Sequence, residues 1–175
     1  MKFAIVSALM TICFLGICST NAETELVKNA KWSKLAANGV PESWENRVTG
    51  SNSFSVTQAA TGNVLKLTVK DPAKTAFFMY RNLPLEAGKR YTVSYEVKGS
   101  ADGKYLLYCE WQRQAPDAAK AVLQSYNTRL QSVSGEWKKL VFTFTFPQDC
   151  RMAYMVLMAK QGEIEFRNLS FTPAK

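Results

Sequence analysis

Strict alternation of apolar and polar residues is the feature that most limits what this chain can fold into. Residues 91–98 (YTVSYEVK) place apolar side chains at odd positions, and residues 140–146 (LVFTFTF) place them at even positions. Because successive side chains of a strand point to opposite faces, each such segment is expected to be a half-buried β-strand. Shorter segments with the same period are residues 54–57, 64–69, 164–166 and 169–171.

Turn residues separate these segments, and helix signals are nearly absent. The one helix candidate, residues 115–121, contains Pro116 and is interpreted as a loop or a single turn. The pattern therefore predicts an all-β fold of two packed antiparallel sheets, a β-sandwich or jelly roll. Reversals are expected at residues 61–63, 71–72, 86–89, 99–103, 134–135 and 161–162.

The first residues have the composition of a secretory signal peptide. Lys2 provides a basic start, residues 3–17 are almost entirely apolar, and Ala22 ends a stretch of small and polar residues. We expect cleavage after Ala22, which leaves residues 23–175 as a single domain, secreted, periplasmic or on the cell surface. The apolar run is shorter than the roughly 20 residues that span a bilayer. A lipoprotein signal at Cys18 is disfavoured by the large Ile17 before it.

The composition excludes several functional classes. The chain has 22 Lys and Arg against 14 Asp and Glu, a net charge of +8, and no histidine. Without histidine, neither a Ser-His-Asp nor a Cys-His mechanism is available, and no metal is held by imidazole. The positive charges are dispersed, which argues against nucleic acid as a partner. They are most simply a solvated surface, and they would also suit an acidic polysaccharide.

Cys109 and Cys150 are the two cysteines that follow the expected cleavage site. An oxidising compartment makes them candidates for a disulfide. The alternative is that both are small buried apolar side chains, because sequence alone does not fix their separation in space.

Five short segments occur in an order that carries a family resemblance. They are residues 26–33 (LVKNAKWS), 39–44 (GVPESW), 85–99 (LEAGKRYTVSYEVKG), 135–147 (GEWKKLVFTFTFP) and 166–171 (FRNLSF). Together they resemble the carbohydrate-binding modules of families 4, 9 and 22, which are jelly rolls of the galactose-binding-like group. The resemblance implies a domain that binds a poly- or oligosaccharide on a concave sheet without cleaving it.

The same family often holds a structural calcium ion between its opening motif and its closing strand. Ser33 and Asn168 stand at these positions here, where the family has acidic residues. Both side chains offer oxygen but no charge, and a hard dication prefers carboxylates. They are therefore weak calcium candidates, and no other cofactor is expected.

A sugar-binding face needs flat rings that stack on pyranoses and polar groups that bind hydroxyls. If the odd positions of residues 105–113 point inward, then Tyr108, Glu110 and Gln112 share the opposite face. The structural alternative is that Tyr108 covers the sheet and Glu110 is ordinary surface polarity.

Two further pairs combine a ring with a forked donor. Tyr80 precedes Arg81, and Tyr126 lies three positions before Arg129. Residues 77–80 (FFMY) are also the densest aromatic run outside the clear strands, which is more typical of a core than of a ligand platform.

Two other functional classes remain open. An enzyme would require a pair of carboxylates, for which Glu96 and Glu110 on neighbouring strands are candidates, or a lyase site built from Tyr and Arg. A structural or adhesion module would use a sheet edge or an aromatic patch to hold a protein or the cell envelope. The sequence favours non-catalytic carbohydrate binding over both.

Overall fold

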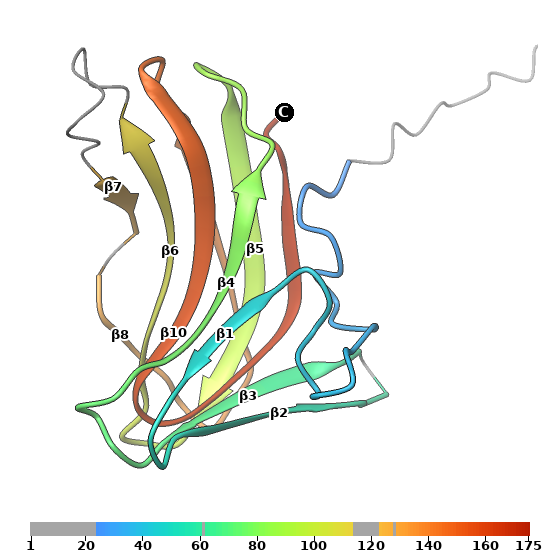
Figure 1. The fold of residues 1–175 in the computed structure, drawn as a ribbon, viewed down its shortest axis with the longest axis vertical. Coiled ribbons are helices and arrows are strands. Elements are labelled where there is room, and N and C mark those ends of the chain that lie inside the picture. The colour runs from blue at the N-terminus through green and yellow to red at the C-terminus, as the bar shows by residue number, and fades with distance from the viewer. Residues whose placement is uncertain (1–23, 61, 114–122, 128) are drawn as a thin grey trace, which may run out of the picture.

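The computed structural model describes residues 24–60, 62–113, 123–127 and 129–175, which form ten antiparallel strands in two layers (Figure 1). These residues contain no helix, and the predicted two-sheet antiparallel sandwich is confirmed. The expected signal peptide and the segment that contains Pro116 lie outside the described residues.

The strands are divided between two sheets that share one long strand. The first sheet contains β1 (Glu45–Val48), β4 (Ala76–Leu83), β6 (Lys104–Arg113), β7 (Leu123–Tyr126) and β8 (Gln131–Ser132). The second sheet contains β2 (Ser53–Thr57), β3 (Val64–Val69), β5 (Arg90–Gly99) and β9 (Lys138–Thr145). The last strand, β10 (Cys150–Pro173), lies at the centre of both sheets.

β10 changes sheet half-way along its length. Its first half lies between β4 and β6, and its second half lies between β3 and β5. Figure 1 shows it running down one layer, turning, and rising in the other layer to the C-terminus. The turn contains Gly162 with φ of 69°, where a Cβ atom would also collide with the Ser100 hydroxyl. Glycine is therefore required at this corner.

Aromatic side chains from both sheets meet in the core. Trp111 of β6 stacks on Phe144 of β9 with ring centroids 5.6 Å apart, and Tyr105 packs against Phe166 at 5.6 Å. The Tyr105 hydroxyl donates to Gln131 Oε1 at 3.0 Å, so this buried phenol has a polar partner. Removal of these facing apolar surfaces from water holds the two layers together.

The predicted alternating strands are present, and the elements without alternation were missed. Residues 153–159 (AYMVLMA) are apolar throughout, yet they form a strand at the centre of the first sheet. Met155 and Leu157 face the core, while Tyr154 and Val156 are buried on the other face. A strand that is buried on both faces has no polar positions, and its period is therefore invisible in the sequence.

Cys109 and Cys150 do not form the candidate disulfide, and the alternative of two buried apolar side chains holds. Cys109 lies opposite Met155, whereas Cys150 lies opposite Arg113, four residues further along β6. Four residues of a strand span about 13 Å, and a disulfide requires Cα atoms within about 7 Å. Both cysteines are free and buried, and burial raises the pKa of each thiol.

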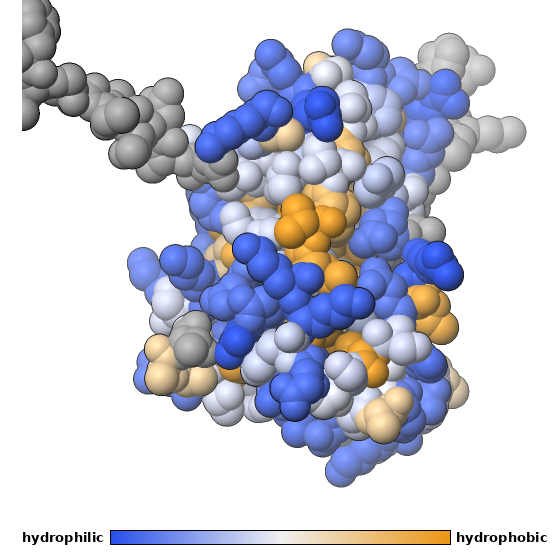
Figure 2. All heavy atoms as spheres, turned by 180° about the vertical axis from the view of Figure 1, so that it is seen from behind, coloured by the Kyte–Doolittle hydropathy of each residue, from blue (hydrophilic) through white to orange (hydrophobic). Residues whose placement is uncertain are grey.

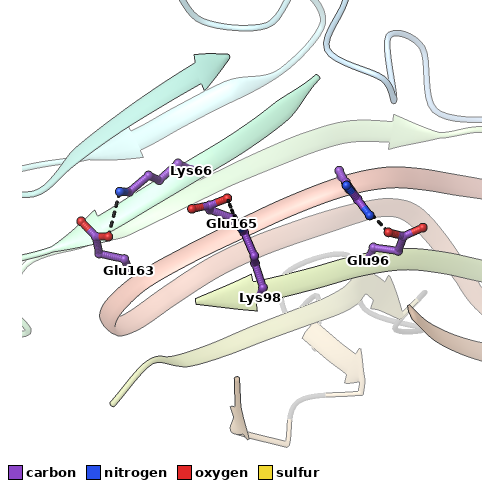
Figure 3. Close-up of polar contacts among 6 residues, drawn as sticks. Lys66, Glu96, Lys98, Glu163 and Glu165 are labelled. Atoms are coloured by element: carbon purple, nitrogen blue, oxygen red, sulfur yellow. Dashed lines mark hydrogen bonds and ion pairs between the residues drawn. The ribbon is translucent and has the colours of Figure 1, made fainter. Parts of the chain in front are cut away.

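The outer face of the second sheet carries a row of ion pairs (Figure 3). Lys66 Nζ lies 2.8 Å from Glu163 Oε2, Lys98 Nζ lies 3.3 Å from Glu165 Oε2, and Arg167 Nε lies 2.7 Å from Glu96 Oε2. The Trp137 ring packs on the same face, 4.1 Å from the Arg167 guanidinium carbon and 5.0 Å from Lys98 Nζ. This face is therefore charged and internally paired.

Acid should weaken the fold through Glu96. Hydrogen bonds from Asn168 and Arg167 hold the pKa of Glu96 below its usual value. A carboxylate with a lowered folded-state pKa stabilises the protein above its unfolded-state pKa, and this contribution is lost as the pH falls through the folded-state value. We expect Glu96→Gln to lower the free energy of unfolding by about 1 kcal/mol at neutral pH, with the difference closing below about pH 4.

Urea unfolding of both proteins at a series of pH values measures this difference. Glu136→Gln, at an exposed carboxylate, is the control and should leave stability unchanged. A deficit of Glu96→Gln that stays constant down to the acid limit would contradict the assignment.

Candidate functional site

Side chains of β6 alternate between the core and the outer face of the first sheet. The odd positions Tyr105, Leu107, Cys109 and Trp111 are at most 5% exposed, whereas the even positions between them are partly exposed. Tyr108, Glu110 and Gln112 therefore lie in a row on the outer face, in the arrangement that the alternation predicted.

The strands beside β6 add an apolar surface to this row. Tyr154 of β10 lies opposite Glu110, Val156 lies opposite Tyr108, and Met79 of β4 lies opposite Val156. Tyr154 is 6% and Val156 is 3% exposed, although neither belongs to the sandwich core. We call this surface the aromatic face; its apolar side chains are Phe77, Met79, Leu106, Tyr108, Tyr154, Val156 and Met158.

Sequence analysis missed most of the aromatic face. Tyr154 and Val156 lie in the continuous apolar run of β10, which carries no alternation to show which side chains point outward. The signal that could have found them is the run itself, because a strand without polar positions must be covered on both faces.

The polar groups on this face suit the recognition of hydroxyls. The Ser125 hydroxyl donates to Glu110 Oε2 at 3.4 Å, which leaves the carboxylate with further acceptor capacity. Burial, and secondarily the negative charge of Glu110, raise the pKa of Tyr108. Tyr108 therefore remains a neutral phenol at physiological pH, with a flat ring and a hydroxyl that donates and accepts.

Arg81 lies at the β1 side of the aromatic face. Its guanidinium carbon is 5.6 Å from the centre of the Tyr154 ring, and its Nε donates to Glu45 Oε1 at 2.5 Å. Glu45 in turn lies opposite Met79 in the pairing of β1 with β4. A pocket of about 490 Å³ opens at this edge, with Lys28, Tyr80 and Arg81 among its lining residues.

The proposed role of Tyr80 as a sugar platform is wrong. Its ring points into the sandwich, is 5% exposed, and packs edge-on against Trp44 with centroids 5.5 Å apart. Its hydroxyl accepts a hydrogen bond from the Lys28 amide at 3.1 Å. The ring is part of the core and is not available for stacking.

Tyr126 and Arg129 also lie away from the aromatic face. The Tyr126 ring stacks on Phe144 of the second sheet at 5.4 Å, and its hydroxyl donates to the Thr143 carbonyl oxygen at 3.2 Å. It packs at the edge between the two sheets and is 39% exposed, so its role as a sugar platform stays a prediction. Arg129 is exposed in the connection between β7 and β8.

The hypothetical hydrolase pair is separated by the whole sandwich. Glu96 lies on the outer face of the second sheet, where it is bound to Arg167 and Asn168. Glu110 lies on the outer face of the first sheet. The expectation that they occupy neighbouring strands is wrong, and they cannot act on one glycosidic bond.

The calcium candidates share a pocket but do not make a calcium site. Ser33 and Asn168 both line a pocket of about 520 Å³ together with Lys31, which brings positive charge, and Glu25, whose Oε1 already accepts from the Val27 and Phe171 amides. The Ser33 hydroxyl donates to Asn29 Oδ1 at 3.4 Å, and the Asn168 amide donates to Glu96 Oε1 at 3.0 Å. Within the described ranges, no three His, Cys, Asp or Glu residues are grouped as metal ligands would be. This donor set does not fit a hard dication.

The fold and the aromatic face define a β-sandwich module with an aromatic and polar surface on one sheet. Residues 24–161 match the family model described as carbohydrate binding domain, of the family 4 and 9 type. The chain therefore belongs to this family of carbohydrate-binding modules, as the sequence resemblance indicated.

Solved structures with the same fold come from several sources. A family 22 module of Clostridium thermocellum xylanase 10B has a TM-score of 0.60 and 11% identity, over 87% of this chain and 98% of that chain. The family 22 xylan-binding domain of Paenibacillus barcinonensis Xyn10C has a TM-score of 0.55 and 15% identity, over 78% and 95% of the two chains. At these identities the likeness concerns the fold.

A third similar structure is much longer than this chain. The enzymatically active domain of bacteriophage CBA120 tailspike protein 4 has a TM-score of 0.63 and 14% identity, over 86% of this chain and 21% of that chain. The chain thus spans about a fifth of the tailspike chain that it matches. A search of curated protein sequences found no match.

The stability of the protein should be independent of calcium. A ligand that binds only the native state, and is present at a concentration of about 100 times its Kd, adds about 2.7 kcal/mol to the free energy of unfolding. Because Ser33 and Asn168 supply no charge, and the Glu25 carboxylate is engaged by two backbone amides, we expect the thermal midpoint to be the same in millimolar calcium and in excess chelator. Differential scanning calorimetry checks this, and a rise of the midpoint with calcium would show that the pocket binds the ion.

Proposed function

We propose that this protein is a secreted, non-catalytic module that binds a poly- or oligosaccharide on its aromatic face. The observation that carries the proposal is the row of Tyr108, Glu110 and Gln112 on β6, beside the apolar Tyr154 and Val156 of β10. The partly exposed Tyr108 ring offers a flat surface for the apolar side of a pyranose. The carboxylate and the amide bind hydroxyls at fixed positions along the strand.

The spacing of acidic residues supports binding without cleavage. Within the described part of the aromatic face, the carboxylates belong to Glu45 on β1 and Glu110 on β6. Two strands, β4 and β10, lie between β1 and β6, so the two strand axes are about 14 Å apart. Glycoside hydrolysis uses two carboxyl groups about 5 to 9.5 Å apart.

Xylan is the first ligand to test. One family 22 structure of the same fold is described as xylan-binding, and another was solved with xylohexaose. Their low identity to this chain means that the ligand enters here as a proposal, and a panel of other β-linked glycans belongs in the same experiment.

The distribution of exposed apolar side chains favours a glycan over a protein partner. Within the described ranges, the large apolar residues with high exposure lie on separate loops and strands. They are Leu35, Tyr126, Leu130, Val141 and Met152. Figure 2 shows the side opposite to that of Figure 1 as mainly hydrophilic, with a small apolar area in its middle. Protein-docking surfaces are usually larger and continuous.

We propose secretion on the basis of residues 1–22. Expression in a host with a general secretory pathway should deliver a chain that starts at Glu23, because the apolar run and Ala22 form a cleavable signal. Mass spectrometry of the exported protein measures its N-terminus. Recovery of only uncleaved chain in the membrane fraction would contradict the proposal. No helix in the part of the chain that the structure describes is long and apolar enough to cross a bilayer.

Binding should depend on Tyr108 and Glu110. We expect Tyr108→Ala to weaken binding about tenfold, or 1.4 kcal/mol, because it removes the exposed ring, and Glu110→Gln to weaken it by a similar factor. Titration calorimetry with xylohexaose, cellohexaose, laminarihexaose and mannohexaose measures these changes. The controls are Val141→Ala and Glu136→Gln, at exposed positions that lie off the aromatic face.

Two results would contradict the proposed function. Equal losses of affinity in the control variants would show that the oligosaccharide does not bind at the aromatic face. The appearance of reducing ends or of unsaturated products during the titration would make the protein an enzyme.

A further inference from the structure

The pocket at the β1–β4 edge contains more hydrogen-bond donors than its neighbours use. It has a volume of about 490 Å³, and its lining residues include Lys28, Ser43, Tyr80, Arg81 and Asn82. Glu45 also lines it and is the acidic residue among the lining positions. The pocket thus has two cationic side chains and one carboxylate.

Arg81 keeps most of its donors for a ligand. Its Nε donates to Glu45 Oε1 and the guanidinium also bonds to the Tyr154 side chain, which leaves most of its five N–H groups available. Arg47 Nη2 lies 4.0 Å from Glu45 Oε2 and brings a third positive charge to the rim. The carboxylate of Glu45 is therefore shared between two arginines and does not neutralise the site.

Lys28 brings a second cationic donor to the pocket. Lys28 is exposed, and its ammonium makes no ion pair within the described ranges. The Tyr80 ring is 5% exposed, so its hydroxyl is held in place by the core. That hydroxyl accepts from the Lys28 amide, and its own proton has no acceptor in the part of the chain that the structure describes. Through this hydrogen bond the buried Tyr80 positions the backbone that carries the exposed Lys28.

The backbone of the pocket wall is also unusual. Ser43 has a φ of 70° and Asn82 has a φ of 56°, both in the left-handed region that non-glycine residues rarely adopt. Asn82 lies where the register between β4 and β10 shifts, next to Arg81. Strained residues of this kind often lie at ligand sites.

Arg81 connects this pocket with the aromatic face. Its guanidinium carbon lies 5.6 Å from the centre of the Tyr154 ring. A glycan that lies across Tyr108 and Tyr154 would therefore place a substituent of the chain into the pocket. The positive balance of the pocket selects a substituent with negative charge.

We infer that the pocket binds the carboxylate of a uronic acid, so that the protein prefers uronate-bearing glycans over neutral ones. This inference rests on the proposed function, because it requires that a glycan lie on the aromatic face. Arg81 and Lys28 pair with the uronate carboxylate.

The test compares each acidic polymer with its own neutral form. The full chain is titrated with glucuronoxylan and with polygalacturonate, each beside the same polymer after reduction of its carboxyl groups to alcohols. At low salt we expect at least one acidic form to bind about tenfold more tightly than its reduced form, with a smaller ratio near 0.5 M salt.

Variants with the same change of net charge, inside and outside the pocket, distinguish binding by the pocket from a general attraction between the protein and an acidic polymer. We expect Arg81→Gln and Lys28→Gln each to abolish most of the preference, and Glu45→Gln to increase it several-fold because a competing carboxylate is removed. Lys66→Gln and Glu163→Gln make the same charge changes in an ion pair on the opposite face, and they should leave the preference unchanged. Circular dichroism verifies that each variant is folded.

Three outcomes overturn the inference. Equal affinity for the acidic and reduced forms removes the uronate preference and leaves the proposed function standing. Equal effects of Arg81→Gln and Lys66→Gln assign the preference to net charge rather than to the pocket. Absence of binding to either form, and to the neutral oligosaccharides above, overturns the proposed function together with this inference.

Discussion

The hydrogen bonding of β10 on both edges in both sheets holds the whole architecture together. Its first half joins β4 to β6, and its second half joins β3 to β5. Without this strand the sandwich would fall into four separate pieces, namely β1 with β4, β6 with β7 and β8, β2 with β3, and β5 with β9. Gly162 is the position at which one continuous strand passes from the first sheet to the second. The packing of the core depends on that corner, because it sets the two sheets face to face.

The position of β10 also explains why the two outer faces differ. On the first sheet its outward side chains are Tyr154 and Val156, which lie between β4 and β6 and make an apolar floor. On the second sheet its outward side chains are Glu163, Glu165 and Arg167, each of which lies in an ion pair. On the first face, Tyr108 and Glu110 beside this floor are partly exposed and are not joined in ion pairs among the described residues. On the second, charged groups already satisfy one another, which leaves a solvated exterior.

The sequence predicted what depends on local periodicity. β6 alternates cleanly, and so the common face of Tyr108, Glu110 and Gln112 followed from residue parity alone. Parity also argues against one of the predicted pairs: Tyr80 and Arg81 are adjacent in β4, and adjacent side chains of a strand point to opposite faces. Arg81 accordingly lies outward, and Tyr80 lies in the core.

Features that depend on the pairing of distant segments could not be predicted. The ring of Tyr126 stacks on β9 of the other sheet, which no pattern within residues 123–130 indicates. The distance between Cys109 and Cys150 depends on the register of β6 with β10, which the bulge near Met152 shifts by a residue. The burial of Tyr154 requires neighbours on both sides of β10, and its apolar sequence is equally compatible with other folds.

The complete two-sheet structure cannot form before its central strand, β10, has been synthesised. Leu65 pairs with Phe166 and Tyr105 pairs with Ala159. Neither sheet is therefore complete until the residues of β10 are available for pairing. The order of synthesis and the order of assembly are thus opposed, and the topology favours slow folding of the finished chain. Until residues 150–173 are available, the preceding strands lack the partner that joins them into two sheets.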